Sequence, residues 1–471
     1  MPLVKYSQEH TDIKDVLKLK AGVSVLVRGW VRNTRTQAAV AFIEMFDGSS
    51  ASTLQVITED NELIGVVKSM SVGSSLSVRG IVTLHPIKTG IVELKLEKIE
   101  YIGSIQDPLT YILNAKKTSL ETLRSSQELR AKTRSLNAVF RIRAGLSKAT
   151  HDFWASLGFH HLNPNVITSG DCEGGGEVFA VSTLLGGPVS DIPVIDKSAH
   201  IDYSKDFFQG PAYLTVSSQL QLEMLCAGLS KVWTSNKSFR SEKSRTTRHL
   251  AEFEHIEWET AWCSLEGLMD QSEQYTQFCF NYVLVKHMDD LEELDRFISK
   301  GIIDRLCSFA YTTYERISYD TAIDIIKEKF DGAPIAWGDD LGSECERFLA
   351  ETVFNKPVFV YNYPASLKSF YMKANDDGRT VQGCDLLIPG LGELIGSSVR
   401  EHDYGKLMAV VEKRGMDPSK LKPYLDLRRN GSTPTAGAGL GFDRLVRICT
   451  GMENIRDVVP FPISYQERLR L

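Results

Sequence analysis

Two extended runs near the middle of the chain, residues 232–240 and 249–260, flank a charged, hydroxyl-rich loop at residues 243–248. This pattern predicts a β-hairpin with a long polar tip. In the second strand the period of two places Phe253, His255, Glu257 and Glu259 on one face. Guanidinium groups suit phosphate oxygens, a flat ring can carry a purine, and a carboxylate can hold an ammonium. The hairpin is therefore either a solvated surface ribbon with ion pairs or one wall of a binding site.

Length and composition limit the classes of protein that the chain can belong to. A chain of 471 residues predicts two or three domains. No apolar run reaches the ~18 residues of a membrane span, and the first ten residues lack a signal or transit pattern, so we expect no membrane association and a cytoplasmic protein. The cysteines are scattered without Cys-x-x-Cys spacing, which predicts neither a disulfide framework nor a zinc site. The net charge of −6 argues against a general nucleic-acid coat but leaves room for a local basic groove.

The first 105 residues contain five short alternating stretches, with a helical segment at residues 61–70 after the third. This order is typical of an OB-fold, although any small β-barrel without nucleic acid would also fit. The first strand and its exit carry one aromatic residue and three cations, namely Trp30, Arg28, Arg32 and Arg35. This pattern favours an RNA-binding barrel, because OB-fold sheets stack unpaired bases on aromatic rings beside cations. Residues 106–130 are expected to form a hinge with short helices.

Residues 131–471 are expected to form a second, larger domain that contains both helices and strands. Three-four spacing of apolar residues predicts a long helix that ends at Gly158, followed by a strand at residues 162–168. An acidic loop at residues 171–177 contains three successive glycines and could close on an ammonium group. Residues 265–298 are expected to be helical, with Tyr275, Phe278 and Val285 on a core stripe. A glycine-rich turn at residues 437–441 would, taken alone, be a helix-packing feature.

Several of these segments together resemble one family. Phe239-Arg240-x-Glu242, followed by a loop and Arg248-His249-Leu250-Ala251-Glu252-Phe253, resembles motif 2 of the class IIb aminoacyl-tRNA synthetases, in particular the asparaginyl-tRNA synthetases. The helix and strand before residue 168 resemble motif 1, and residues 437–445 resemble motif 3. The sequence departs from the family at Asn165, where motif 1 has its proline, and at Ser397, where a second glycine is usual.

The resemblance implies an α+β protein with an OB-fold anticodon-binding domain at residues 1–105, a hinge at 106–130 and a catalytic domain at 131–471. The catalytic domain is expected to be built on an antiparallel β-sheet flanked by helices, and motif 1 implies a homodimer. The implied activity is ATP-dependent ligation of L-asparagine to tRNA(Asn) through an asparaginyl-adenylate, with ATP and Mg²⁺ required.

The resemblance also assigns site residues. Arg240, Arg444 and Glu393 are the expected catalytic residues, and Glu393 is the expected Mg²⁺ ligand. The expected ATP-binding residues are Arg240, Glu242, Arg248, His249, Leu250, Phe253, Glu393, Gly441 and Arg444. The expected amino-acid-binding residues are Glu173, Ser217, Gln219, Leu222, Glu257 and Arg400. The expected tRNA-binding residues are Arg28, Trp30, Phe42 and Gln55.

Leu222 bears on the choice between asparagine and aspartate. In the aspartyl relatives a lysine at this place pairs with the substrate carboxylate, whereas a neutral carboxamide needs no counter-charge. The alternatives are an aspartyl enzyme, which could also charge tRNA(Asn), a paralogue that no longer charges tRNA, and a non-catalytic RNA-binding module. Retention of the anticodon-like domain argues against the paralogue, and retention of Arg240, Glu393 and Arg444 argues against the module.

Overall fold

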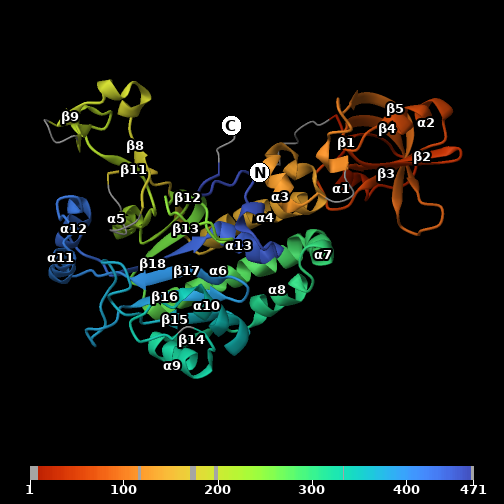
Figure 1. The fold of residues 1–471 in the computed structure, drawn as a ribbon. Helices are drawn as coiled ribbons and strands as arrows, with labels where there is room; N and C mark the ends of the chain where they lie inside the picture. Colours follow the sequence, from red (N-terminus) through yellow and green to blue (C-terminus); the bar gives the residue numbers. More distant parts are fainter. Residues whose placement is uncertain (1–8, 115–117, 170–176, 196–199, 333, 468–471) are drawn as a thin grey trace. The chain divides into compact units, whose positions relative to one another are not determined.

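The computed structural model describes residues 9–114, 118–169, 177–195, 200–332 and 334–467 (Figure 1). The chain divides into two compact units, Met1–Arg141 with His287–Lys300, and Ile142–Lys286 with Gly301–Leu471. The first unit therefore includes the segment expected to be a hinge, together with the first turns of a long helix. The predicted domain boundaries at residues 105 and 130 stay a prediction.

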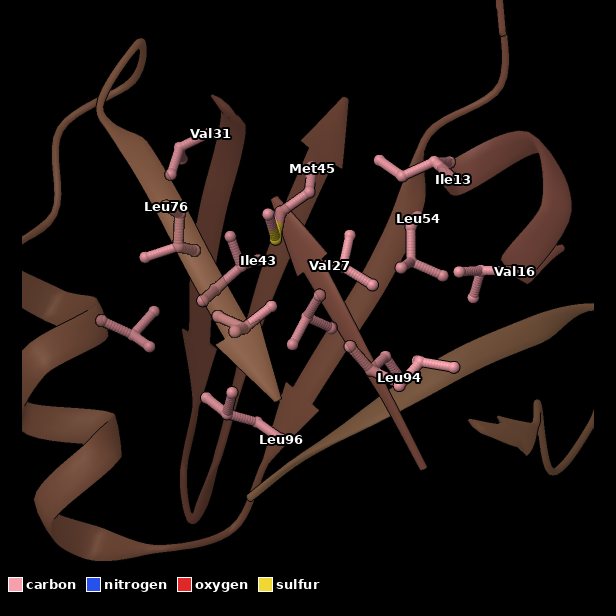
Figure 2. Packing of buried hydrophobic residues seen from close by; sticks show 14 of the residues in the cluster. Ile13, Val16, Val27, Val31, Ile43, Met45, Leu54, Leu76, Leu94 and Leu96 are labelled. Atoms are coloured by element: carbon pink, nitrogen blue, oxygen red, sulfur yellow. The ribbon is translucent and has the colours of Figure 1, made fainter. Parts of the chain in front are cut away.

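The first unit contains a closed five-stranded barrel with strand order β1-β2-β3-β5-β4. Its strands are β1 (Ser24–Gln37), β2 (Val40–Phe46), β3 (Leu54–Thr58), β4 (Ser75–Leu84) and β5 (Val92–Gly103). Alternate residues point inward, and Figure 2 shows Val27, Ile43, Met45 and Leu94 meeting inside the barrel. Helix α2 (Asn61–Ser69) follows β3, and the Asp60 side chain caps its first turn. The closed barrel and its helix confirm the predicted OB-fold.

The remaining elements of the first unit are helical. Helix α1 (Ile13–Val16) places Ile13 and Val16 in the barrel core. The segment after the barrel contains η1 (Ile112–Asn114), α3 (Leu120–Ser125) and η2 (Gln127–Lys132), and helix α4 (Arg134–Ser156) begins there. Arg141 of α4 donates two hydrogen bonds, of 2.9 and 2.6 Å, to Asp290 of α7 (Met288–Phe297).

The second unit is built on an eight-stranded sheet with order β14-β15-β16-β17-β18-β13-β12-β6. Its strands are β6 (His160–His161), β12 (Lys231–Phe239), β13 (Glu252–Ala261), β14 (Glu315–Ser318), β15 (Val358–Tyr361), β16 (Gly383–Ile388), β17 (Gly392–Val399) and β18 (Thr435–Gly441). The pairs from β15 to β12 are antiparallel, as predicted, but β14–β15 and β6–β12 are parallel. The sheet is mixed because each of these outer pairs is joined by a long connection rather than a hairpin.

One face of this sheet is covered by α4 and α6 (Leu265–Lys286). Trp258 of β13 stacks against Trp154 of α4, with ring centroids 4.8 Å apart, and Trp154 also contacts Tyr275 of α6. The predicted stop of α4 is confirmed, because Gly158 follows it with φ +76°. The single helical run predicted for residues 265–298 breaks at His287 into α6 and α7. The predicted core stripe is wrong beyond Tyr275, because Val285 is 63% exposed.

The strand predicted for residues 162–168 is confirmed only at its end, Ile167–Thr168, and is not continuous. His160–His161 pair with β12, while β7 (Ile167–Thr168) pairs with β11 (Ala212–Leu214), which also pairs with β8 (Ala180–Val181). Pro164 has no N–H to donate to a ladder, and its carbonyl oxygen instead accepts from Asn236 Nδ2 at 3.0 Å. The chain therefore changes sheets at the displaced proline.

The second unit contains further short strands and helices outside the eight-stranded sheet. They are η3 (Leu184–Gly186), η4 (Val189–Asp191), β9 (Val194–Ile195), β10 (His200–Ile201), η5 (Tyr203–Lys205), α5 (Gln219–Leu229), α8 (Ile302–Tyr311), α9 (Tyr319–Lys329), α10 (Gly342–Arg347), η6 (Phe348–Val353), α11 (Tyr404–Lys413), α12 (Lys422–Arg429), α13 (Phe442–Thr450) and η7 (Ile455–Asp457). Within the described part of the chain, no helix is both long and apolar enough to cross a membrane.

Candidate active site

The predicted hairpin forms the centre of the site. Strands β12 and β13 pair antiparallel, with Ser238 opposite Phe253, and the Arg240 N–H donates to Ala251 at 3.0 Å. On its other edge β13 pairs with β18, which places Glu259 opposite Gly437 and Glu257 opposite Gly439. A Cβ atom at Gly439 would lie 2.5 Å from His255 Nε2. The glycine-rich segment is thus a strand that leaves room for long side chains on β13, rather than a helix-packing run.

All nine predicted ATP-binding residues line one cavity of about 220 Å³. They come from the hairpin and its tip (Arg240, Glu242, Arg248, His249, Leu250 and Phe253), from β17 (Glu393), and from the junction of β18 and α13 (Gly441 and Arg444). The Arg240 guanidinium carbon lies 5.6 Å from the centre of the Phe253 ring. The cavity therefore combines a flat ring with several cations, a surface suited to a purine and phosphate groups.

Several cations surround the Glu393 carboxylate at this cavity. Arg444 Nη1 donates to the Glu393 carbonyl at 2.8 Å and lies 3.4 Å from its carboxylate. Partial burial would raise the pKa of Glu393, but Arg444, Lys368 and Arg240 together hold it below its usual value. Burial lowers the pKa of His255, which favours the neutral imidazole. Glu393 is accordingly an ionised carboxylate among cations.

A second cavity, of about 260 Å³, adjoins the first, and Arg240, His255, Glu393 and Gly439 line both. It contains five of the six predicted amino-acid-binding residues, namely Ser217, Gln219, Leu222, Glu257 and Arg400. The sixth, Glu173, lies outside the described residues. The two cavities share part of their walls, so a nucleotide and an amino acid could lie side by side in them.

Glu257 and Arg400 give this second cavity opposite charges. The buried Glu257 carboxylate accepts from the Ser217 hydroxyl and, at 2.9 Å, from the Ser218 N–H. Arg400 donates to Glu259 through Nε and Nη2 at 3.1 and 2.8 Å, and to Ser398 Oγ at 2.7 Å. A carboxylate and a guanidinium can therefore meet the ammonium and the side-chain oxygen of one ligand.

Burial and ion pairing act in opposite directions on the Arg400–Glu259 pair. Burial raises the pKa of Glu259, and Arg400 opposes this rise. Burial would lower the pKa of Arg400, but the carboxylates of Glu259 and Glu223 raise it above its usual value. The two-pronged contact is the geometry of an ionised carboxylate and a guanidinium.

The structure adds charged residues that sequence reasoning missed. Glu223, Tyr424 and Arg428 form a buried cluster behind Gln219, and Lys368 Nζ lies 2.5 Å from Asp385 Oδ2. Glu223 directly follows Leu222, one of the expected amino-acid-binding residues, but its partners in α12 are about 200 positions away in the sequence. Nothing in the local pattern at residues 422–429 indicates that pairing.

The residues near Glu393 fit a Mg²⁺ ion. A Cβ atom at Gly396 would lie 3.1 Å from Glu393 Oε1 and 3.7 Å from Asp385 Oδ1, so two carboxylates flank this glycine. Among the described residues no three His, Cys, Asp or Glu side chains gather into a metal cage. The two carboxylates beside Gly396 suit Mg²⁺, which is usually held by one or two carboxylates with nucleotide phosphates and water. Ser397, the departure from the family pattern, donates to the Cys384 carbonyl at 2.8 Å.

The predicted tRNA-binding residues lie on the barrel in two places. Arg28 and Trp30 line a hollow of about 580 Å³ together with Tyr101. Phe42 and Gln55 lie on the neighbouring strands β2 and β3, with the Arg35 guanidinium carbon 4.3 Å from the centre of the Phe42 ring. Gln55 Nε2 donates to Glu93 Oε1 at 2.6 Å. Arg28 and Trp30, both on β1, thus share one hollow, whereas Phe42 and Gln55 lie on β2 and β3.

Comparisons with known proteins agree with this arrangement. Residues 119–465 match the family model of class II tRNA synthetases (D, K and N), and residues 25–102 match the OB-fold nucleic acid binding domain. The chain is 44% identical to an asparagine–tRNA ligase of Nostoc sp. over 94% of this chain and 96% of the relative. It is 42% identical to one of Colwellia psychrerythraea over 96% and 97%.

A solved structure supports the same assignment. The asparaginyl-tRNA synthetase of Pyrococcus horikoshii complexed with asparaginyl-adenylate superposes with a TM-score of 0.86 at 33% identity, and covers 98% of this chain and 100% of that one. The match extends over both units of the protein. The chain therefore belongs to the asparagine–tRNA ligase family of class II tRNA synthetases.

Proposed function

We propose that this protein activates L-asparagine with ATP and transfers the asparaginyl group to tRNA(Asn). The observation that carries the proposal is that two adjoining cavities share part of their walls. One is lined by Phe253, Arg240 and Arg444, and the other is bounded by Glu257 and Arg400. A nucleotide in the first and an amino acid in the second would meet beside Arg240.

The first step joins the amino acid to the nucleotide. An oxygen of the asparagine carboxylate attacks the α-phosphorus of ATP. The bond between the α-phosphorus and the oxygen that bridges to the β-phosphate breaks, and pyrophosphate leaves with the electron pair of that bond. No proton transfer is needed, so the residues act by position and charge. Glu257 holds the ammonium, Arg400 donates to the carboxamide oxygen, and Arg240 neutralises charge at the α-phosphate. Glu393 would hold a Mg²⁺ ion, which supplies positive charge to the phosphate oxygens when bound.

In the second step a hydroxyl of the terminal tRNA ribose attacks the activated carbonyl carbon, and the bond from that carbon to the phosphate oxygen breaks. AMP leaves with the electron pair of that bond, and the hydroxyl proton passes to the departing phosphate or to water. The barrel would bind the anticodon, with Phe42 stacking on a base, Gln55 hydrogen-bonding it, and Arg28 and Trp30 contacting the RNA nearby. We propose further that the protein is a cytoplasmic homodimer that pairs through its motif 1 region. Glu173 would close over the bound amino acid.

The test is amino-acid-dependent ATP–pyrophosphate exchange, measured in parallel with asparagine and aspartate. Exchange with asparagine alone is expected, because Leu222 supplies no cation to a side-chain carboxylate. Exchange with aspartate would move the protein to the aspartyl branch. Exchange with neither amino acid, also in the presence of tRNA, would contradict the proposal.

A further inference from the structure

The turn between β16 and β17 leads directly into Glu393, which lines the nucleotide cavity. Two carboxylates of one helical segment accept hydrogen bonds from the backbone of this turn and of the strand start that follows it. Glu346 of α10 accepts from the Glu393 N–H at 3.2 Å, and Glu351 of η6 accepts from the Gly390 N–H at 2.8 Å. The helical segment α10–η6 therefore holds the approach to Glu393 at two places.

The geometry of this helical segment lets both carboxylates reach the turn. Residues five apart in a regular α-helix lie about 140° apart around the axis, on different faces. Here α10 continues into η6, a stretch of π-helix, and i→i+5 turns bring residues five apart towards one face. Such turns are rare and frequent at functional sites. The π-helix thus gives Glu346 and Glu351 a common target.

Glu346 also contacts the tip of the β12–β13 hairpin. Its Oε2 lies 3.7 Å from Arg248 Nη1, which donates to the Leu391 carbonyl at 2.9 Å. Gly392 lies against both side chains with φ +89°, and a Cβ atom there would lie 2.5 Å from Glu346 Oε2 and 2.9 Å from Arg248 Nη1. The backbone conformation and the available space both require glycine at this position.

The two partners of Glu346 face the nucleotide, but Glu346 does not. Arg248 and Glu393 line the nucleotide cavity, whereas Glu346 lies outside its lining. We propose that Glu346 is a positioning residue for ATP and Mg²⁺, which fixes the backbone of Glu393 and the guanidinium group of Arg248 in one arrangement. The inference rests on the proposed function and deepens it. Neither Glu346 nor Arg248 lines the amino-acid cavity, so loss of Glu346 should weaken the binding of Mg²⁺·ATP and spare that of asparagine.

The experiment compares nucleotide binding with amino-acid binding in variants of Glu346. Equilibrium dialysis gives the Kd of Mg²⁺·ATP without turnover, and pyrophosphate exchange gives the KM values of ATP and asparagine. Burial and the Glu393 carboxylate raise the pKa of Glu346 to about 7, so both assays are run at pH 8. Glu346→Ala should raise the Kd and the ATP KM about tenfold, which corresponds to ~1.4 kcal/mol, and leave the asparagine KM within about twofold of wild type.

Two further variants separate position from stability. Glu346→Gln keeps an oxygen that can accept from the Glu393 N–H, so its affinity for Mg²⁺·ATP should fall between those of wild type and Glu346→Ala. Glu351→Ala is the matched control, because it removes the other carboxylate that bonds this turn, at Gly390, which does not line the nucleotide cavity. It should leave the Kd and both KM values unchanged. Urea unfolding of both alanine variants measures any loss of stability.

Three results would overturn the inference: unchanged Mg²⁺·ATP affinity in Glu346→Ala, an equal rise of the ATP and asparagine KM values, or the same loss of affinity in Glu351→Ala. A Glu346→Gln variant as weak as Glu346→Ala would also overturn it, because the bond to the Glu393 backbone would then contribute nothing. Absence of asparagine-dependent exchange in the wild-type protein would instead overturn the proposed function, while dialysis with Mg²⁺·ATP would still test Glu346.

Discussion

A methyl group added at Gly437 should separate the binding of the amino acid from the binding of ATP. Gly437 lies opposite Glu259 in the β13–β18 ladder. Its added Cβ atom would lie 1.8 Å from Glu259 Oε2, 2.4 Å from the Trp258 carbonyl oxygen and 2.7 Å from Arg400 Nη2. The carbonyl belongs to the central strand and cannot move alone, so the Arg400–Glu259 pair must shift.

The size of the effect follows from overpacking. Inserting a methyl group into a packed interior costs about 1–3 kcal/mol. Displacement of Arg400 should raise the KM for asparagine roughly tenfold, which corresponds to ~1.4 kcal/mol. The KM for ATP should change little, because neither Glu259 nor Arg400 lines the nucleotide cavity. Urea unfolding and pyrophosphate exchange at varied asparagine and ATP measure these quantities.

Gly228→Ala provides the matched control. Gly228 is exposed in α5 of the same unit, and a Cβ atom there meets nothing within 4 Å. This substitution should stabilise the helix by up to ~1 kcal/mol and leave both KM values unchanged. Wild-type stability and wild-type asparagine KM in Gly437→Ala would refute the packing argument. An equal rise in both KM values would refute the assignment of Arg400 to the amino-acid end.

Four further predictions concern single side chains. Arg240→Ala should lower pyrophosphate exchange by at least ~10²-fold, since a preorganised cation is lost at the reacting phosphate; near-normal exchange would exclude that role. Leu222→Lys should raise the KM for asparagine, because Leu222 is 1% exposed and the new ammonium would be desolvated; unchanged kinetics would remove Leu222 as a discriminator. Phe42→Ala should leave exchange intact but weaken tRNA charging, as loss of a base stack costs about 1–3 kcal/mol; equal losses in both assays would contradict a separate anticodon role. Cys226 should resist iodoacetamide at pH 8 until the protein is denatured, because burial and Glu259 raise its pKa to about 12; mass spectrometry of the native protein would detect any modification.

The parts of the fold that were predicted correctly have short-range patterns. The barrel strands alternate with a period of two, so Val27, Ile43 and Met45 identify the core without knowledge of the topology. The nine residues that the resemblance assigned to ATP binding line one cavity, and six of them come from a single hairpin and its tip. Its tip brings Arg248 and His249 back to Arg240 through local pairing.

The parts that were missed depend on long-range contacts. Glu223 and Arg428 are 205 positions apart, and neither helix carries a pattern that indicates a buried partner. The strand at residues 162–168 was expected from its place after the long helix, but Pro164 interrupts its hydrogen bonding. Val285 lies off the packed face of α6, because the neighbouring Val283 and Leu284 are buried and the buried positions keep a three-four spacing from which the predicted stripe departs after Tyr275.

The glycines of β18 leave the space that the long side chains of β13 need, because the two sets of residues lie opposite each other. Residues directly opposite in an antiparallel pair point to the same face, and here Gly437 and Gly439 lie opposite Glu259 and Glu257. A Cβ atom at Gly437 would meet the Glu259 carboxylate, and one at Gly439 would meet the His255 ring, so a side chain on β18 would occupy space that side chains of β13 already fill. The alternation of glycine on one strand is thus the complement of the alternation of acidic residues on the other. Either pattern alone fits a solvated hairpin or a simple turn, whereas the two in register require an open cavity above the centre of the sheet.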